Sequence, residues 1–265
     1  MKILRLGNSD DLNPAVPVED QGWYYSQNLI AAQIGEPVET VVRAIWPGPE
    51  LPRLVDEWMD RYEPDLVFLK VTWFWYAYES VPRRIERLLG RAGKPIAGAA
   101  LGAAKRPSLA RNPGFKLGRR IAHRVIGGDT PFATSQVIAV MEEVVRRVTT
   151  RENIALLVKG TGDGRGPDDG IPGSHERFNA RRIEVEGEIE RFCASVHVPY
   201  IGTGRIPAAS GRMDLKKSDG VHRGADSHNR MGLWEGEAML KTWLEFRGAG
   251  REDRAGTTGS SRGSR

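Results

Sequence analysis

The stretch Ile3-Leu4-Arg5-Leu6-Gly7-Asn8-Ser9-Asp10 is a short, mostly apolar run that passes directly into a turn. Four later runs have a similar length and character, and continuous apolar runs of this kind are typical of strands buried on both faces of a parallel sheet. The predicted strands cover residues 3–6, 39–45, 65–71, 153–159 and 199–202. The sequence therefore predicts a parallel sheet of about five strands.

Longer helical patterns alternate with these strands. In residues 51–62 the apolar side chains recur at i, i+3, i+4, i+7, i+8 and i+11, the spacing of an amphipathic helix, and residues 137–148 repeat it. Further helices are predicted over residues 22–34, 80–89, 175–196 and 226–246. Strands that alternate with helices indicate an α/β protein, and we predict a three-layer α/β/α sandwich of flavodoxin-like type.

Two segments do not follow this alternation. Residues 97–131 are rich in Gly, Pro and Arg and show no long periodic stretch, so we interpret them as a basic insertion that forms a lid or an oligomer contact. Residues 248–265 are mostly Gly, Ser, Thr and Arg without an apolar face, which predicts a disordered tail. We expect a single domain over residues 1–247 that contains the insertion.

The net charge of +5 is unevenly distributed. The tail from Arg247 onward holds five Arg against two acids and contributes +3, which leaves +2 for the body. A basic stretch from Lys105 to Arg124 contains no carboxylate and could attract an anionic substrate or a nucleic acid. We favour a solvated, mobile basic loop, and do not expect a nucleic-acid partner.

Cysteine content and hydropathy restrict the class of protein further. Cys193 is the only cysteine, so an intramolecular disulfide is excluded and a cysteine metal site is not expected. We predict neither a metal nor a cofactor. No apolar run approaches the roughly 20 residues that span a bilayer, and the N-terminal residues contain no signal-peptide h-region. We expect a cytoplasmic protein without a membrane partner; its oligomeric state stays open.

A second fragment near the other end, Asp219-Gly220-Val221-His222, complements Ser9 chemically. Serine is a weak nucleophile, so a base must take its proton as it attacks, and an Asp can hold that base in the correct tautomer. Ser9, Asp219 and His222 together therefore suggest a hydrolase. The alternative is that Ser9 is an ordinary turn residue, Asp219 a helix cap and His222 a surface histidine.

The order of these residues resembles the SGNH (GDSL-type) hydrolase family. Gly7-Asn8-Ser9-Asp10 keeps the Gly and Ser of the GDSL block but departs at its second and fourth letters, and Asp219 to His222 match the DxxH block fully. The resemblance covers most of residues 2–245. It implies an α/β/α fold, a nucleophile at Ser9 and an acid and base at Asp219 and His222.

The resemblance also implies an oxyanion hole, made by the nucleophile's own N–H, a glycine after the second strand and an asparagine after the third. Gly48 lies at the glycine's place, although an ordinary Pro-Gly turn explains it equally well. After the third strand the sequence offers Phe74 in an ungapped register, or Thr72 after a two-residue shift, and neither is Asn. We favour Thr72, because its hydroxyl is a competent donor.

Aromatic residues follow the third strand directly. Trp73, Phe74 and Trp75 would border such a site and could stack on a sugar or wrap an acyl chain. Aromatic residues after a buried strand are more often part of the core, so both interpretations stay open.

From the sequence we therefore predict a serine-dependent hydrolase of carboxylic esters, an esterase or deacetylase that acts through an acyl-enzyme on Ser9. Its expected partner is a small-molecule or glycan ester. An acyltransferase would use the same triad. The missing Asn keeps open a catalytically weak or inactive binding protein of the same fold, and the basic segments keep open a binder of anions or nucleic acid.

Overall fold

The computed structural model describes residues 1–9, 11–13, 16–104, 112–161, 173–202 and 225–258. Its centre is a parallel sheet in the order β2-β1-β3-β4-β5. The strands are β1 (Lys2–Gly7), β2 (Glu39–Ala44), β3 (Leu66–Lys70), β4 (Ala155–Lys159) and β5 (Tyr200–Ile201). Each predicted strand is present, so the predicted five-stranded parallel sheet is confirmed.

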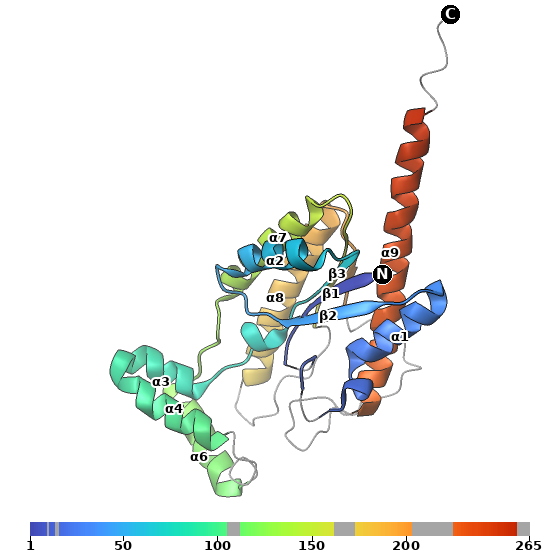
Figure 1. The fold of residues 1–265 in the computed structure, drawn as a ribbon. Helices are drawn as coiled ribbons and strands as arrows, with labels where there is room; N and C mark the ends of the chain where they lie inside the picture. Colours follow the sequence, from blue (N-terminus) through green and yellow to red (C-terminus); the bar gives the residue numbers. More distant parts are fainter. Residues whose placement is uncertain (10, 14–15, 105–111, 162–172, 203–224, 259–265) are drawn as a thin grey trace, which may run out of the picture.

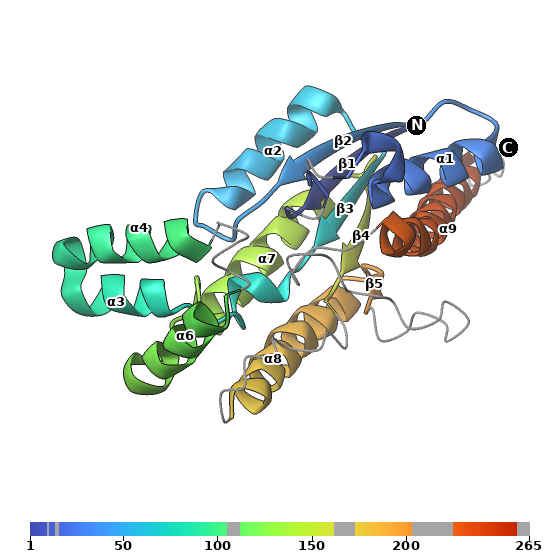
Figure 2. The ribbon, with the colours of Figure 1, turned by 90° about the horizontal axis from the view of Figure 1, so that it is seen from below.

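Helices cover both faces of the sheet (Figures 1 and 2). One face carries α1 (Gly22–Ile34), preceded by a short 3-10 turn, η1 (Val18–Asp20), and α9 (Ala225–Thr258). The opposite face carries α2 (Leu51–Tyr62), α7 (Thr134–Thr149) and α8 (Ser174–Ser195). The three-layer α/β/α sandwich is therefore confirmed. None of the described helices combines the length and the apolar character that crossing a membrane requires.

Alternation along the strands divides the core in two, because successive side chains of a strand point to opposite faces. Leu4 and Leu6 pack with α2, α7 and α8, whereas Ile3 packs toward α1 and α9. Arg5, Lys70 and Lys159 share the parity of Ile3, so these three basic side chains lie on the α1–α9 face of adjacent strands, with Lys70 and Lys159 at the carboxyl ends.

Among the described residues, three helices project from one side of the body, and we call residues 80–129 the helical arm (Figure 1). It contains α3 (Val81–Leu89), the 3-10 turn η3 (Gly90–Ala92), α4 (Gly93–Ala104) and α6 (Pro113–Ile126). An antiparallel bridge between Ser80 and Asp129 closes its base.

The arm differs from the mobile basic loop expected between Lys105 and Arg124, because α6 covers the second half of that stretch. Helix α6 begins at a capped end, since the Asn112 side chain accepts hydrogen bonds from the N–H groups of Gly114 at 2.8 Å and Phe115 at 3.3 Å. An Asn before a Pro at the first helical position is a strong start signal, which the Gly and Arg content had obscured.

Helix α9 is longer than expected. It includes the predicted helix over residues 226–246 and continues to Thr258, past the start of the predicted tail. Residues 259–265 lie outside the described residues.

Candidate active site

The candidate site lies where the parallel strands end. Ser9 follows β1, Gly48 follows β2 and Thr72 follows β3, and these strands are neighbours in the sheet. The backbone ties the ends of β1 and β2 together, since Ile45 N–H donates to Gly7 O at 3.0 Å. Ligands of open parallel sheets bind outside the carboxyl ends of the strands, so the topology alone brings these three residues to one edge.

Ser9 is exposed in a tight turn after β1. The Asp11 N–H donates to Asn8 O at 3.1 Å, and Asn8 N–H donates back to Asp11 Oδ2 at 3.2 Å. This reciprocal pair closes the turn. A Cβ at Gly7 would lie 2.0 Å from Asp11 Oδ2, so only glycine allows Asp11 to fold back against the strand.

Asp11 anchors the Ser9 turn to two strands. Its carboxylate accepts hydrogen bonds from Arg5 Nε at 2.9 Å and Nη2 at 2.7 Å, and from Lys70 Nζ at 2.8 and 2.9 Å. Arg5 and Asp11 are both buried, and Lys70 is half-buried. The turn is therefore fixed from below by charge-assisted hydrogen bonds, which are the stronger kind.

Helix α9 completes this buried ionic cluster through Glu235, which is fully buried. Its two carboxylate oxygens accept from Arg5 Nη2 and from Lys159 Nζ. Aromatic rings cover the cations, with the Arg5 guanidinium 4.7 Å from the centre of the Phe68 ring and Lys159 Nζ 5.4 Å from that of Trp234. Among the described residues the cluster holds three cations and two carboxylates.

The cluster keeps its two carboxylates ionised. Burial alone would raise the pKa of Asp11, but Arg5 and Lys70 outweigh it and hold that pKa well below its ordinary value. Burial likewise opposes ionisation of Glu235, yet Arg5 and Lys159 lower its pKa. Burial would lower the pKa of Arg5, and the two carboxylates raise it instead. The edge that presents Ser9 therefore rests on fixed charges with a net positive sign.

The three proposed donors of the oxyanion hole differ in availability. Within the described part of the chain, neither the Ser9 N–H nor the Thr72 hydroxyl makes a hydrogen bond. The Gly48 N–H, by contrast, donates to Trp46 O at 2.8 Å. The Glu50 carboxylate also lies against Gly48, where a Cβ would be 2.4 Å from its oxygen. Gly48 can serve an oxyanion only after this turn opens.

The three aromatic residues after β3 fall into two groups. Trp75 is buried in the core with α7, which gives it a packing role. Trp73 and Phe74 are half-buried in the 3-10 turn η2 (Trp73–Trp75), with ring centres 6.2 Å apart. The exposed Trp46, from the loop after β2, packs against Phe74, with the two ring centres 6.0 Å apart. We therefore restrict the candidate substrate platform to Trp73 and Phe74 and add Trp46.

A second polar cluster follows β4. Thr161 N–H donates to Glu186 Oε1 at 2.9 Å, and the Thr161 hydroxyl donates to Val71 O at 3.1 Å, beside Thr72. Burial, reinforced by Glu186, raises the pKa of Tyr200 far above the ordinary phenol value. The Tyr200 phenol stays neutral at physiological pH and supplies no base.

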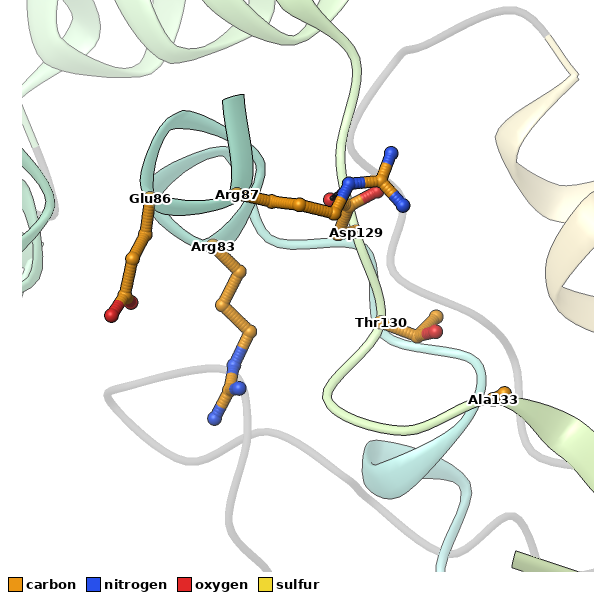
Figure 3. Close-up of a pocket in the computed structure, with 6 residues that line it drawn as sticks. All are labelled: Arg83, Glu86, Arg87, Asp129, Thr130 and Ala133. Atoms are coloured by element: carbon orange, nitrogen blue, oxygen red, sulfur yellow. Dashed lines mark ion pairs between the residues drawn. The ribbon is translucent and has the colours of Figure 1, made fainter. Parts of the chain in front are cut away.

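A pocket of about 470 Å³ lies at the base of the helical arm (Figure 3). Figure 3 shows Arg87 reaching from α3 to Asp129, and their ion pair measures 2.8 Å. The pocket is lined by Arg83, Glu86, Arg87, Asp129, Thr130 and Ala133. None of these residues lies at the strand ends, so the pocket is separate from the candidate active site. The two carboxylates and the two Arg side chains of its lining neutralise one another.

Asp219 and His222 lie outside the described residues, so their roles as the acid and base beside Ser9 stay predictions. Among the residues that the structure does describe, no group of three His, Cys, Asp or Glu side chains is arranged to hold a metal ion.

Comparison with known proteins bears on the fold. No protein-family model matches the chain, and no curated protein matches it. The esterase EstA from a Pseudoalteromonas species, determined as a structure inhibited by monoethylphosphonate, is similar with a TM-score of 0.51 and 12% identity over 92% of this chain and 98% of that one. This chain shares the fold of EstA. The likeness supports the fold that the resemblance to SGNH hydrolases implied.

Another esterase is similar at a lower score. Est24, a carbohydrate acetylesterase from Sinorhizobium meliloti, has a TM-score of 0.48 and 12% identity, over 89% of this chain and 97% of that one.

Sequence reasoning missed the ionic cluster, although a signal for it was present. Arg5, Lys70 and Lys159 each interrupt an otherwise apolar strand near its carboxyl end. A charged residue in a strand buried on both faces needs a partner, because burial of an unpaired charge is costly. Which acids supply the partners, Asp11 and Glu235, was not visible in the sequence.

Proposed function

We propose that this protein is a serine hydrolase that cleaves carboxylic esters at the carboxyl edge of its sheet. The observation that carries the proposal is the exposed Ser9, held in a turn that Asp11 ties to Arg5 and Lys70. A nucleophile must be exposed and also fixed, because positioning supplies a large share of the rate. The esterase fold supports the same reaction class.

The chain topology supports Asp219 and His222 as its partners. The segment that contains them leaves β5 at Ile201, whose carbonyl accepts from Gly160 N–H at 2.9 Å, and returns at α9. The first turns of α9 touch the same edge, since Met231 Sδ lies 3.1 Å from Lys159 Nζ. Both ends of the segment therefore lie on the Ser9 side of the sheet.

In the proposed reaction, Ser9 Oγ attacks the ester carbonyl carbon while His222 takes the hydroxyl proton. Asp219 would orient the imidazole. The tetrahedral oxyanion would accept hydrogen bonds from the Ser9 N–H and the Thr72 hydroxyl, above the net positive cluster. His222 returns its proton to the leaving alcohol, and water then releases the acyl group from Ser9. Trp46, Trp73 and Phe74 would border the acyl or sugar part of the substrate.

The second candidate is a weak or inactive protein of the same fold. It is favoured by the occupied Gly48 N–H and by Thr72 where the resemblance implies Asn. Loss of one oxyanion donor costs about 10²–10³ in rate, so two imperfect donors would leave little catalysis.

Covalent labelling with a fluorophosphonate probe distinguishes the two candidates. We expect the wild type to be labelled, Ser9→Ala to lose labelling, and Ser195→Ala, which changes an exposed serine at the end of α8, to keep it. In hydrolysis of short acyl esters, His222→Ala should lose about 10²–10⁴ in rate. Thr72→Val should lose about 10²–10³, because it removes the donor but keeps the shape.

Equal labelling of wild type and Ser9→Ala would refute the nucleophile. Folded wild-type protein that neither reacts with the probe nor hydrolyses esters would favour the second candidate, a weak or inactive protein of the same fold.

A further inference from the structure

The helical arm holds an unusual concentration of positive charge. Between residues 80 and 129 the sequence contains twelve Lys and Arg against two acids, Glu86 and Asp129, a net charge of +10. Because the whole chain has a net charge of +5, the remaining residues sum to −5. The arm and the rest of the molecule are therefore opposite in sign, and a partner of the arm must be anionic.

The same arm exposes aliphatic side chains on α6. Leu117, Ile121 and Val125 are four residues apart, so they form one stripe along the helix, and they are 57%, 56% and 77% exposed. Arg120 and Arg124 are also exposed and lie beside this stripe. A helix with an aliphatic stripe flanked by Arg is the pattern of a helix that lies in a membrane interface.

A second exposed group lies where α3 meets α4. Leu88, Leu89 and Ile96 are each more than half exposed there, and Arg91 and Lys94 lie between them in the sequence. Two parts of the arm thus combine aliphatic and basic side chains.

We propose that the helical arm docks on the surface of an anionic phospholipid bilayer. Such a surface matches both properties, because its headgroups attract the basic residues while its acyl boundary receives the aliphatic ones. This peripheral contact differs from the sequence-based expectation of no membrane partner, which rested on the lack of a spanning segment. It is also independent of the proposed esterase activity.

Other occupants fit less well. Two arms of two copies would bring net charges of +10 together. A single-stranded nucleic acid would satisfy the charge, but sites for it use aromatic rings to stack the bases, and the exposed apolar residues of the arm are Leu, Ile and Val.

Vesicle flotation with the full-length protein tests the proposal. Vesicles of phosphatidylcholine are compared with vesicles of equal parts phosphatidylcholine and phosphatidylglycerol. We expect at least tenfold more protein to float with the anionic vesicles than with the neutral ones. The amount that floats with the anionic vesicles should fall as salt is raised to about 1 M, where the Debye length is about 3 Å.

Two sets of variants separate the two properties of the arm. L117S/I121S/V125S removes the stripe, and R91Q/K94Q/R124Q removes three charges. Each should reduce anionic-vesicle binding at least tenfold. The matched body controls I183S/L244S and R53Q/R191Q/K241Q change residues that are equally exposed, and they should bind like wild type. Circular dichroism and thermal melting establish that each variant is folded.

The proposal is overturned if wild type floats equally with both vesicle types or with neither, or if arm and body variants behave alike. Self-association that L117S/I121S/V125S abolishes, in the absence of vesicle binding, would assign the stripe to a second copy. Binding to a single-stranded oligonucleotide that this variant retains, again without vesicle binding, would assign the charge to nucleic acid.

Discussion

The Asp11 side chain shows how one residue connects the core to the candidate site. It closes the turn that carries Ser9, and it also neutralises Arg5 and Lys70. A buried ion pair adds little net stability over apolar residues of the same shape, but breaking one leaves an uncompensated charge. Substitution at position 11 is therefore expected to lower the stability of the protein, even though Asp11 takes no part in the proposed reaction.

We predict that Asp11→Asn lowers the free energy of unfolding by about 3–5 kcal/mol, because Arg5 would keep its charge in a buried place with one carboxylate fewer. Urea unfolding measures the change. The matched control is Asp60→Asn, whose ion pair with Arg151 at 2.9 Å is exposed and should contribute less than about 1 kcal/mol. Equal effects of the two substitutions would show that the cluster is not buried as described.

At the scale of elements, α9 determines where Glu235 enters the cluster, and its position depends on close packing against α1. Gly232 lies so near α1 that a Cβ there would be 2.2 Å from Gly22 O. The Ser26 hydroxyl donates to Gly232 O at 2.7 Å across the same contact. The two helix backbones approach closely only because glycine occupies this position.

Gly232→Ala should therefore destabilise the protein by about 1–3 kcal/mol, since α9 must move away from α1 and carry Glu235 with it. Gly248→Ala is the control in the same helix. Nothing lies within 4 Å of a Cβ there, so alanine should be neutral or stabilising by up to about 1 kcal/mol. Thermal unfolding of both variants checks this. A destabilisation by Gly248→Ala equal to that by Gly232→Ala would contradict the packing argument.

At the scale of the whole molecule, the buried carboxylates make stability depend on pH. The pKa values of Asp11 and Glu235 are lower in the folded protein than in the unfolded chain, where they are near 3.9 and 4.3. On acidification the unfolded chain therefore binds protons first. The stabilisation is fully present above the unfolded pKa values and is lost as pH falls toward the folded ones.

We accordingly expect the urea midpoint to be flat near neutral pH and to fall steadily below about pH 4–5. Glu235→Gln should be less stable at pH 7 and show a shallower fall, because one of the two shifted groups is gone. Midpoints measured across this range provide the check. A wild-type midpoint that rises on acidification would contradict the ionised state of the cluster.

Much of the fold could be predicted from local sequence patterns. The apolar runs gave the five strands, and the 3.6-residue periodicity gave the helices around them, because both signals depend on neighbours along the chain. The same reasoning placed Ser9, Gly48 and Thr72 after consecutive parallel strands, and therefore at one edge. It did not predict α6 within residues 97–131, because Gly and Arg hid the capped start of that helix.

The sequence by itself thus determined the sandwich, the edge where its candidate site lies and the turn that holds Ser9. Only the tertiary structure decided that Asp11 and Glu235 meet three cations from three strands, that Trp75 belongs to the core, and that the Gly48 N–H is already bonded to Trp46. The physical reason is that strand and helix formation follow from local periodicity. Pairing of buried charges instead depends on residues such as Arg5 and Glu235, which are 230 positions apart and meet only when α9 packs on the sheet.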